Sequence, residues 1–381
     1  MKRQHLKIAI TCPRYLPYGR RGSERYVFDL CNFFSSRGHE VTIITSKPGK
    51  SRIQRRGNTT IISNRYLQHP LLLRHPRLVF HTFALSCFTS LLTGKYDIVH
   101  SLLYPDGYAL SINRIIKRTK YVFQVTNSPN SIIGDMSIAR WMLNGAVCRA
   151  DRLVSSSQYI KSLVKEELGY ESDVIPVPVD CSFFRPISTK DMNHPRILYA
   201  GSLNDPRKRV DLLIEAFNIL IGKNAKAILQ LSGEVNAEVK SRLLSRAHTN
   251  ALDSVYFLGA GRFTDMPKLY SEASVTVLPS IDEAQGMVLN ESLACGTPVV
   301  GTNSAGIPEI INDLDVGTLF ESSDTSLEVS ARALCEGIHR TIDLSKDPQT
   351  VQRCREHAMR FSWEVIGPQI EQLYYKVLNK K

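Results

Sequence analysis

Apolar and polar positions along this chain follow the rhythm of strands alternating with helices. Short apolar runs of strand length recur, and segments with apolar residues at helical spacing lie between them. Lys7–Thr11 is the first expected strand, residues 23–37 form the first expected helix, and 41–45 the next strand. Such alternation predicts parallel, doubly wound sheets, which bind ligands at the carboxyl ends of their strands.

The same alternation continues on both sides of a proline-rich interruption. In the first half, further strands are expected at residues 59–63, 97–100, 121–125 and 152–155, and helices at 78–92 and 159–168. Residues 174–186 hold three prolines and a polar stretch follows, so a domain boundary is expected near residue 190. In the second half, strands are expected at Arg196–Ala200, 227–232, 255–258, 274–278, 298–301 and 316–320.

Length and composition favour two globular domains. At 381 residues, with 43% apolar and 22% charged residues, the chain is too long for one ordinary domain. We expect an N-terminal domain at residues 1–190 and a C-terminal domain at 191–363. A last helix at 364–381 comes too late to belong simply to the second sheet.

Positive charge is concentrated in the first quarter of the chain. Residues 1–95 hold 17 Lys/Arg and three acids, whereas the remainder holds 31 basic and 33 acidic residues. Basic clusters lie at residues 20–21, 52–56 and 74–77. A basic face across residues 14–77 attracts anionic partners, and peripheral contact with an anionic membrane is the expectation, with a merely solvated face as the alternative. No nucleic-acid-binding pattern accompanies the charge, so no nucleic acid partner is expected.

Cysteine usage and the start of the chain indicate the compartment. The eight scattered cysteines form no Cys-x-x-Cys pair and no Cys/His cluster at zinc spacing, which indicates reduced, mostly buried thiols. The apolar run at residues 6–11 has strand length and ends at Pro13, which favours a first strand over a signal peptide. We expect a cytoplasmic protein, peripheral on the inner face of the cell membrane.

One apolar segment, residues 78–92, allows two interpretations. It is too short to span a bilayer, and His81 and several Ser/Thr residues interrupt it. It is either a core helix that packs on the first sheet or an amphipathic helix that lies on a membrane beside Arg74 and Arg77.

The most informative segment runs from residue 279 to residue 300. A strand ends there, a loop carries Glu283 and Gly286, a helix begins near Met287, and a Gly-x-Pro turn ends that helix. Free N–H groups at a positive helix end suit a phosphate, and a second carboxylate, Glu291, could hold sugar hydroxyls. An anion site flanked by two acids suits a nucleotide-sugar better than a bare phosphate.

This segment resembles the Glu-x7-Glu signature of the retaining family 4 glycosyltransferases, and the similarity continues through Gly306 and Glu309. The resemblance implies the α/β GT-B fold: two Rossmann-like, doubly wound parallel-sheet domains that face a central cleft. It implies that residues 1–190 form the acceptor-side domain and residues 191–363 the nucleotide-sugar-binding domain, and that the last helix, residues 364–381, crosses back to complete the first domain. It also implies a nucleoside-diphosphate sugar donor and transfer to an acceptor hydroxyl by front-face substitution, in which the diphosphate takes the acceptor proton.

The resemblance assigns donor-binding roles in the second half of the chain. Glu283 corresponds to the carboxylate that holds the donor sugar, and Glu291 to the one that bonds the nucleotide ribose. Gly286, Met287 and Val288 are expected to present backbone N–H groups to the donor, and Gly259 and Ala260 lie where the family seats the base of the nucleotide.

Cations for the diphosphate are expected after the strand Arg196–Ala200. Lys208 matches the family's lysine, whereas Ser202 stands where an arginine is usual, so Arg207 or Arg209 could supply the second charge; a solvated turn is the alternative for both arginines. The leaving diphosphate accumulates negative charge, and its stabilisation is often the largest catalytic contribution. Lys208 and Glu283 are therefore the expected catalytic residues.

The first half of the chain offers fewer matches to the family's motifs. Gly22 and Glu24 match the family's Gly-Gly-Ala-Glu loop after the first strand, with Gly22 as a donor-side backbone contact. Thr126 or Asn127 stands where the family commonly places a histidine near the donor sugar. His100, at a neighbouring strand end, is a further candidate for the sugar side, with a structural histidine as the alternative.

The sequence thus predicts a retaining hexosyltransferase of cell-surface glycan or glycolipid synthesis, with a glycan or lipid-linked acceptor. No metal or other cofactor is expected, because Lys208 and helix N–H groups could replace a cation. The alternatives are a sugar-nucleotide epimerase and a catalytically degenerate relative that binds anionic lipid or a partner. A glycoside hydrolase is disfavoured, because Glu283 and Glu291 are expected to lie too far apart for paired catalysis.

Overall fold

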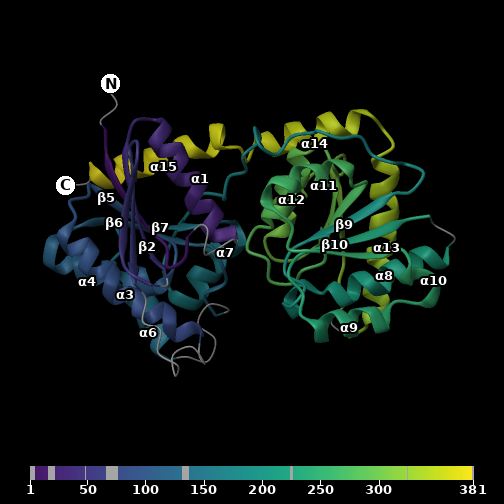
Figure 1. The fold of residues 1–381 in the computed structure, drawn as a ribbon, viewed down its shortest axis with the longest axis horizontal. Coiled ribbons are helices and arrows are strands. Elements are labelled where there is room, and N and C mark those ends of the chain that lie inside the picture. Colours follow the sequence, from purple (N-terminus) through teal and green to yellow (C-terminus); the bar gives the residue numbers. More distant parts are fainter. Residues whose placement is uncertain are drawn as a thin grey trace. The chain divides into compact units, whose positions relative to one another are not determined.

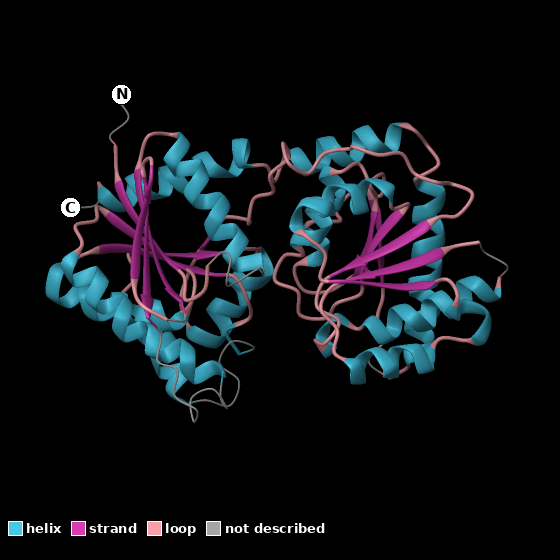
Figure 2. Cartoon of the chain, viewed as in Figure 1, coloured by secondary structure: helices cyan, strands magenta, loops and turns pink. Residues whose placement is uncertain are grey.

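The chain folds into two compact α/β units, each built around its own sheet (Figures 1 and 2). The computed structural model describes residues 5–15, 22–47, 49–65, 76–130, 137–223, 226–323 and 325–379, and for residues 76–80 the backbone alone. Unit 1 comprises Met1–Val177 together with Ile366–Lys381, and unit 2 comprises Pro178–Val365.

The units divide earlier along the chain than the proline-rich stretch suggested. Val179, Cys181 and Phe184 are buried in a core cluster of unit 2, so the residues that follow Val177 already pack with the second sheet. The division therefore follows Val177 rather than residue 190, and the chain returns to unit 1 at Ile366 rather than at residue 364. Apolar side chains between the prolines, rather than the prolines themselves, decide to which core the segment belongs.

Unit 1 is built on an eight-stranded sheet in the order β3-β4-β2-β1-β5-β6-β7-β8. Figure 1 shows α3, α4 and α6 on one side of this sheet and α1 and α15 on the other. The strands are β1 (Lys7–Thr11), β2 (Glu40–Lys47), β3 (Arg52–Arg56), β4 (Thr59–Arg65), β5 (Ile98–Ser101), β6 (Lys120–Val125), β7 (Arg152–Ser155) and β8 (Asp173–Val174). The helices are α1 (Gly22–Ser36), α3 (Pro76–Thr93), α4 (Tyr104–Lys117), α6 (Ser137–Cys148), α7 (Gln158–Leu163) with a π-helical continuation at Val164–Leu168, and α15 (Trp363–Leu378).

The outer strand β3 departs from the expected all-parallel sheet. It pairs antiparallel with β4, and Ile53 lies opposite Ile62. Its sequence, Arg-Ile-Gln-Arg-Arg, has no buried face, and positive side chains on an edge strand discourage pairing with another chain. The basic residues at 52–56 therefore form an exposed sheet edge, whereas those at 20–21 and 74, and the side chain of Arg77, lie outside the described residues.

The apolar segment at residues 78–92 forms α3, which packs on α4, β2 and β4. Phe83, Cys87 and Leu91, spaced by four residues, are buried on one stripe, as expected for a core helix. Leu85 faces outward and is 68% exposed. Among the residues that the structure describes, no helix has the length and apolar character needed to cross a bilayer.

Unit 2 is built on a six-stranded parallel sheet in the order β11-β10-β9-β12-β13-β14. One apolar core lies between this sheet and α8 and α13, and a second lies on the side of α11, α12 and α14. The strands are β9 (Arg196–Ala200), β10 (Ile228–Ser232), β11 (Val255–Gly259), β12 (Val275–Leu278), β13 (Val299–Thr302) and β14 (Gly317–Phe320). The helices are α8 (Val210–Gly222), α9 (Ala237–Arg246), α10 (Thr249–Leu252), α11 (Met266–Glu272), α12 (Met287–Ala294), α13 (Leu327–Leu344) and α14 (Gln349–Met359).

Each sheet has a point at which its strand order reverses. In unit 1 the chain runs outward from β1 in one direction and from β5 in the other, and in unit 2 the same happens at β9 and β12. Open α/β sheets bind their ligands beyond the carboxyl ends of the strands at this point. The loops after β1, β5, β9 and β12 are therefore the positions from which a site is expected to be built.

The C-terminal helix α15 completes unit 1. Glu371 accepts hydrogen bonds from Arg37 (2.7 Å to Nη2) and contacts the ring of His39 (3.0 Å), both of which follow α1. One turn later, the ring of Tyr374 stacks on Phe34 with centroids 4.9 Å apart. Helix α15 thus covers the apolar surface around Phe34 of α1, which would otherwise be exposed.

Candidate active site

The loops after β9 and β12 meet at the reversal point of the unit 2 sheet. The Lys208 ammonium forms an ion pair with the Glu283 carboxylate, and the Ile281 amide donates to the carbonyl of Arg207 (3.0 Å). Both side chains of the pair are about four-fifths buried. The structure therefore brings together the two residues that were expected to be catalytic, although they lie 75 positions apart in the sequence.

The β9 loop is shaped so that Lys208 projects toward Glu283. Asp205 accepts the Arg207 amide (3.0 Å) and starts a 3-10 turn at Pro206–Lys208, which ends at Arg209 in the left-handed conformation (φ 47°). Burial opposes ionisation of Asp205, but hydrogen bonds from Arg207 lower the pKa of this carboxyl below its ordinary value. This local fold explains why a Pro-Arg-Lys-Arg sequence forms a defined turn.

The two neighbouring arginines differ from Lys208 in their partners. The Arg207 guanidinium lies 2.8 Å from Asp205 and 3.4 Å from Asp282, and its side chain is 45% exposed. Arg209 donates to the Ser322 hydroxyl in the loop after β14. All three cations thus have partners, but only Lys208 is paired with Glu283, the carboxylate expected to hold the donor sugar, so Lys208 is the best placed cation for a diphosphate at this sheet edge.

The N-terminus of α12 faces the same loop. Gly286 precedes the helix with φ 83°, and its carbonyl accepts the Leu289 amide (2.9 Å). Within the described part of the chain, the amides of Met287 and Val288 have no acceptor, as is usual for the first turn of a helix. A Cβ at residue 286 would also lie 3.2 Å from side-chain atoms of Leu278 and Leu289, so glycine suits both the conformation and the space.

Glu291 is placed differently from Glu283. It lies on the first turns of α12, is only 6% exposed, and accepts a hydrogen bond from the Tyr270 hydroxyl of α11 (2.8 Å). This bond fixes the orientation of the carboxylate. Nothing in the sequence around Tyr270 identified it as a partner, because the contact depends on how α11 packs against α12.

Glycines end the three strands on the β9 side of the sheet. Gly201, Gly233 and Gly259 follow β9 and β10 and close β11, and the Gly233 amide donates to the carbonyl of Gly259 (2.9 Å). A Cβ on Gly233 would lie 1.6 Å from the carbonyl oxygen of Gly201. Sequence reasoning named Gly259 but missed Gly233, although a glycine after each of three successive strands was a visible signal.

Ser202 occupies the position at which the family resemblance expected an arginine. It is exposed, and its carbonyl accepts the Tyr199 hydroxyl (3.0 Å). Burial, reinforced by the charge of Glu283, raises the pKa of Tyr199, which therefore stays a neutral donor. This tyrosine shapes the loop start, and the serine side chain adds no positive charge there.

Of the unit 1 candidates, His100 is a structural residue in the interior. It is 1% exposed, its Nε2 lies 2.9 Å from the Gln124 carbonyl oxygen, and its Nδ1 lies 2.6 Å from the Tyr374 hydroxyl. Gln124 can only accept through that oxygen, so Nε2 carries the proton and Tyr374 donates to Nδ1. Burial lowers the pKa of His100 to about 4, and the expectation that it faces a substrate gives way to its structural alternative.

The other unit 1 candidates lie at accessible positions. Thr126 and Asn127 follow β6, where Thr126 is half-buried and Asn127 exposed, and the Asn127 amide donates to the Thr126 hydroxyl (3.4 Å). Gly22 is exposed at the first position of α1, while the Glu24 carboxylate is buried. Thr126 and Asn127, after β6, and Gly22 and Glu24, in the first turn of α1, follow the carboxyl ends of their strands, where ligands are expected.

A buried carboxylate lies at the reversal point of the unit 1 sheet. Asp106, on the first turn of α4, accepts hydrogen bonds from Thr11 at the end of β1 and from Ser101 at the end of β5 (2.8 Å for Ser101). Burial raises the pKa of Asp106 to about 7, even though both hydroxyls favour its ionised form. Sequence reasoning missed this residue, because an aspartate beside a proline is also typical of an ordinary helix start.

The acidic groups of unit 2 also bear on metal binding. The Asp-Leu-Asp run at residues 313–315 precedes β14 and therefore lies at the amino edge of the sheet, opposite to Lys208 and Glu283. Within the described ranges, no three His, Cys, Asp or Glu side chains are grouped closely enough to hold a metal ion.

Comparisons with known proteins place both units in one enzyme class. A model of the glycosyl transferases group 1 matches residues 181–358, and a model of glycosyltransferase family 4 matches residues 20–183. A phosphatidyl-myo-inositol mannosyltransferase of Propionibacterium freudenreichii is 22% identical over 390 residues, which cover 97% of this chain and 94% of that protein.

Solved structures show the same fold. Sucrose-phosphate synthase from Thermosynechococcus elongatus is similar with a TM-score of 0.80 at 20% identity, covering 98% of this chain and 99% of that chain. HepE of Anabaena, in complex with UDP and glucose, is similar with a TM-score of 0.75 at 17% identity, covering 98% of this chain and all of that one. With family models matching both units and GT-B enzymes sharing the fold, the chain belongs to the group 1 glycosyltransferases and is a glycosyltransferase of the GT-B fold.

Proposed function

We propose that this enzyme is a retaining glycosyltransferase that uses a nucleoside-diphosphate sugar. The observation that carries the proposal is the Lys208–Glu283 pair beside the open first turn of α12, at the reversal point of a parallel sheet. A cation and unpaired amides suit a diphosphate, and a carboxylate suits the hydroxyls of the attached sugar. HepE, which was solved with UDP and glucose, provides a precedent for such a donor on this fold.

In the proposed reaction, the residues of unit 2 mainly stabilise the leaving group. The bond between the sugar C1 and the diphosphate oxygen breaks, and a bond between C1 and the acceptor oxygen forms on the same face of the sugar. The acceptor proton passes to the departing diphosphate. Lys208 and the amides of Met287 and Val288 stabilise the accumulating negative charge, while Glu283 orients the sugar and Glu291 the ribose.

We further propose that the transfer does not depend on a divalent metal. The Lys208 ammonium and the first turn of α12 provide positive potential where the diphosphate would lie. If this is right, EDTA leaves the initial rate unchanged. Restoration of lost activity by Mg²⁺ or Mn²⁺ would contradict it.

For the acceptor, we propose a lipid-linked or otherwise anionic glycan on the cytoplasmic face of the cell membrane. The support is the basic excess of the first quarter of the chain, together with the similarity to a protein named as a phosphatidyl-myo-inositol mannosyltransferase. An anionic acceptor predicts a KM that rises with ionic strength, while kcat changes little.

The donor is tested by thermal shift against UDP-, GDP-, ADP- and dTDP-sugars. One donor is expected to raise the Tm of the wild type, and Lys208→Ala and Glu291→Gln are expected to abolish this shift. The matched controls Lys223→Ala, directly after α8, and Glu238→Gln, on α9, change exposed residues and are expected to retain it. In turnover assays Lys208→Ala should lower kcat/KM by roughly 10²–10³-fold.

Turnover assays also distinguish sugar transfer from epimerisation of the sugar nucleotide. Product that forms from the donor alone, with no acceptor, would identify a sugar-nucleotide epimerase and overturn the proposed transfer. A well-folded protein that no donor stabilises would contradict the assigned donor site. The anomeric configuration of the product, determined by NMR, decides between retention and inversion.

A further inference from the structure

Helices α4 and α6 form a close pair on one side of the unit 1 sheet. A Cβ on Gly107 of α4 would lie 2.8 Å from the Cβ of Ala146, and one on Gly145 of α6 would lie 2.8 Å from the Tyr108 ring. Each helix therefore presents a glycine to a larger residue of the other. This reciprocal packing fixes the two helices against each other and makes the groove above them a rigid feature.

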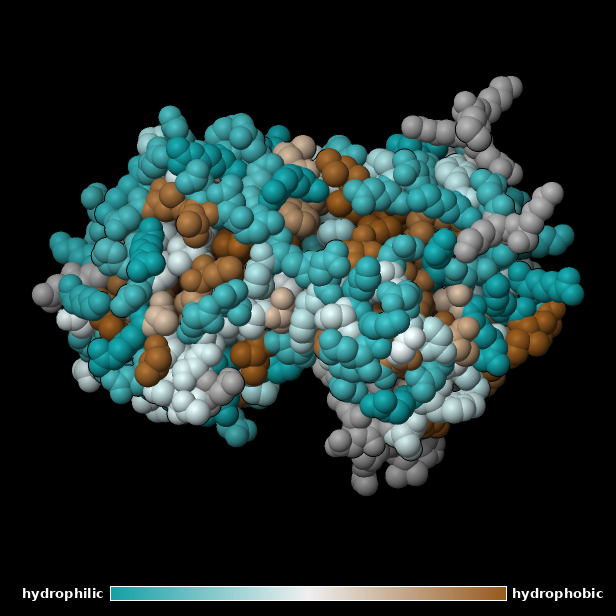
Figure 3. Space-filling view, turned by 180° about the vertical axis from the view of Figure 1, so that it is seen from behind, coloured by the Kyte–Doolittle hydropathy of each residue, from teal (hydrophilic) through white to brown (hydrophobic). Residues whose placement is uncertain are grey.

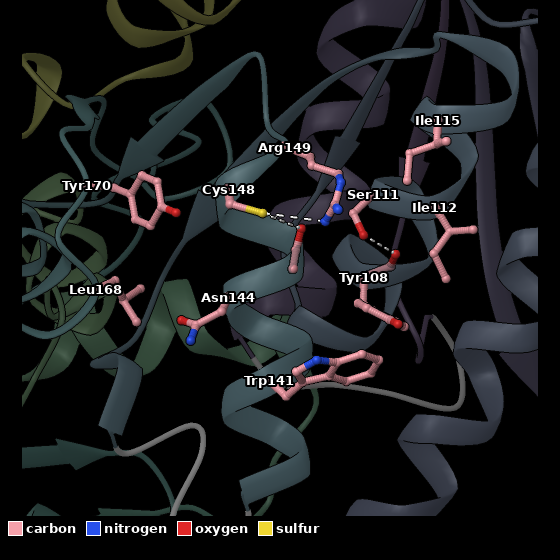
Figure 4. A pocket seen from close by; sticks show the side chains of 11 residues that line it. Tyr108, Ser111, Ile112, Ile115, Trp141, Asn144, Cys148, Arg149, Leu168 and Tyr170 are labelled. Carbon is pink, nitrogen blue, oxygen red and sulfur yellow. Dashed lines mark hydrogen bonds between the residues drawn. The ribbon is translucent and has the colours of Figure 1, made fainter.

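The groove has a volume of about 530 Å³, and its lining combines aromatic and aliphatic side chains with the polar Ser111, Asn144 and Arg149 (Figure 4). Trp141 of α6 packs its ring on Tyr108, with centroids 4.6 Å apart, beside Ile112 and Ile115 of α4. The side chains of Trp141 and Ile115 are nevertheless 60% and 65% exposed. Contiguous exposed apolar side chains, such as this tryptophan next to isoleucines, usually mark a binding surface.

The apolar exposure extends along both helices. Ile138 lies one turn before Trp141 on α6 and is 51% exposed, and Ile116 follows Ile115 with 59% exposure. Figure 3 shows apolar atoms at the surface of unit 1 over α4. We call Ile115, Ile116, Ile138 and Trp141 the α4–α6 patch.

Positive charge borders this patch on α4 and α6. Residues 104–120 and 137–149 contain six Lys/Arg, and their one acid, Asp106, is buried. Lys117, Arg118, Arg140 and Arg149 are exposed. The other two, Arg114 and Lys120, are paired with Asp151.

We propose that the α4–α6 patch docks on an anionic phospholipid bilayer. Trp141 and the isoleucines enter the headgroup region, and Lys117, Arg118, Arg140 and Arg149 contact the lipid phosphates. Exposed apolar side chains with an aromatic ring, inside a border of Lys and Arg, have the chemistry of an interfacial membrane surface. The membrane contact expected from the sequence is thereby assigned to α4 and α6 rather than to the basic edge strand β3 or to α3. This proposal does not depend on the proposed sugar transfer.

Charge favours the bilayer over a second copy of the chain. If two copies paired through this patch by a two-fold axis, each copy would place its exposed cations against those of the other. Neither α4 nor α6 carries an exposed acid that could neutralise these cations in such a dimer. A membrane rich in anionic headgroups supplies the missing negative charge.

The test uses the full-length protein and vesicles of 70% phosphatidylcholine and 30% phosphatidylglycerol. Cys148 borders the groove and is the one exposed cysteine among eight, all within the described residues, so a bimane label can be attached to it. Anionic vesicles are expected to co-sediment the protein and to shift the bimane emission to the blue. Pure phosphatidylcholine vesicles, or 0.5 M NaCl, should weaken both signals.

Matched variants locate the contact. Trp141→Ser with Ile115→Ser, and separately Arg118→Glu with Arg149→Glu, should each lower the vesicle partition coefficient at least about tenfold. Leu314→Ser with Val329→Ser, and Arg242→Glu with Arg332→Glu, make the same changes at exposed positions of unit 2 and should leave it unchanged. Lys208→Ala should lose turnover but keep vesicle binding, which separates this proposal from the proposed function.

Two outcomes would overturn the proposal. In the first, Arg52→Glu with Arg55→Glu on β3 abolishes binding while the Trp141/Ile115 variant binds normally, which would place the contact on the edge strand. In the second, sedimentation velocity shows a dimer that Trp141→Ser dissociates, while the wild type ignores vesicles. That result would make the patch an interface between copies.

Discussion

Asp106 is the residue through which pH is expected to act on folding. Its pKa is about 7 in the fold, where burial disfavours the charge, against 3.8 for an ordinary aspartate. Since the folded pKa lies above the unfolded one, the contribution of Asp106 to stability is complete below about pH 4. This contribution is lost as the pH rises toward 7 and above, and the free energy of unfolding falls by a total on the order of 4 kcal/mol.

Asp106→Asn removes this dependence while keeping an oxygen that accepts from Thr11 and Ser101. We expect the unfolding free energy of the variant, relative to wild type, to increase by about 2–3 kcal/mol between pH 5 and pH 8. Urea denaturation at four pH values measures this, with Asp253→Asn as an exposed control. Parallel pH profiles for wild type and Asp106→Asn would show that the carboxyl is ionised throughout.

Gly233 is expected to tolerate no side chain. Its Cβ would overlap the carbonyl oxygen of Gly201, and the strain would displace the loop that carries Lys208. We expect Gly233→Ala to lower the unfolding free energy by about 2–3 kcal/mol and to weaken donor binding.

The control for that prediction is Gly222→Ala at the end of α8, where nothing lies within 4 Å of the added Cβ. It should be neutral or stabilise by up to about 1 kcal/mol. Denaturation curves, with and without the donor, measure both variants. Equal stability of the two would mean that the Gly201 loop moves freely.

At the residue scale, sequence could point to Lys208, Glu283 and the helix start at Met287, because each lies in the segment after a strand that the apolar pattern reveals and matches the family's motif there. It could not identify Tyr270 or Asp106, because their roles come from contacts between elements. His100 was ambiguous for the same reason. Whether a strand-end histidine points to the ligand edge or to the interior depends on Tyr374, which lies 274 residues later.

At the element scale, buried strands were the most predictable features. Lys7–Thr11, Arg152–Ser155 and Arg196–Ala200 were expected with the bounds that the structure gives them, because strands buried on both faces are continuous apolar runs. β3 was missed because it has no buried face. α4 was missed because its first turn contains Pro105 and Gly107, residues that are more typical of turns.

The helix α15 contributes to unit 1 through the Tyr374 hydroxyl. We expect Tyr374→Phe to lower the unfolding free energy by about 1–3 kcal/mol, because His100 Nδ1 would remain buried without its donor. Tyr256→Phe, at a 49% exposed position of β11, should change it little. Chemical denaturation measures both variants, and equal stabilities would mean that water replaces the lost hydroxyl.

At the scale of the whole molecule, the two units are expected to differ in their ability to fold when expressed alone. Unit 2 is one continuous segment, Pro178–Val365, with both of its apolar cores complete. We expect this segment alone to fold cooperatively and to bind the nucleoside diphosphate of the donor. Circular dichroism and calorimetric titration measure this, and a fragment without a thermal transition would contradict it.

Residues 1–177, expressed alone, should not reach a stable fold, because α15 is missing. Phe34 would lose its stacking partner, and Arg37 and His39 would lose Glu371. Addition of a peptide that spans residues 363–381 is expected to restore structure. A stable fold of residues 1–177 without it would show that α15 is dispensable.

The late return of the chain to unit 1 has a consequence for the order of events on the ribosome. The residues that contact α15 emerge early, but their partners at Glu371 and Tyr374 are synthesised only after the whole of unit 2. Unit 1, the first to begin translation, is therefore the last to be completed. Until synthesis ends, its apolar surface beside Phe34 stays uncovered, and this interval is when a chaperone would be most useful to the nascent enzyme.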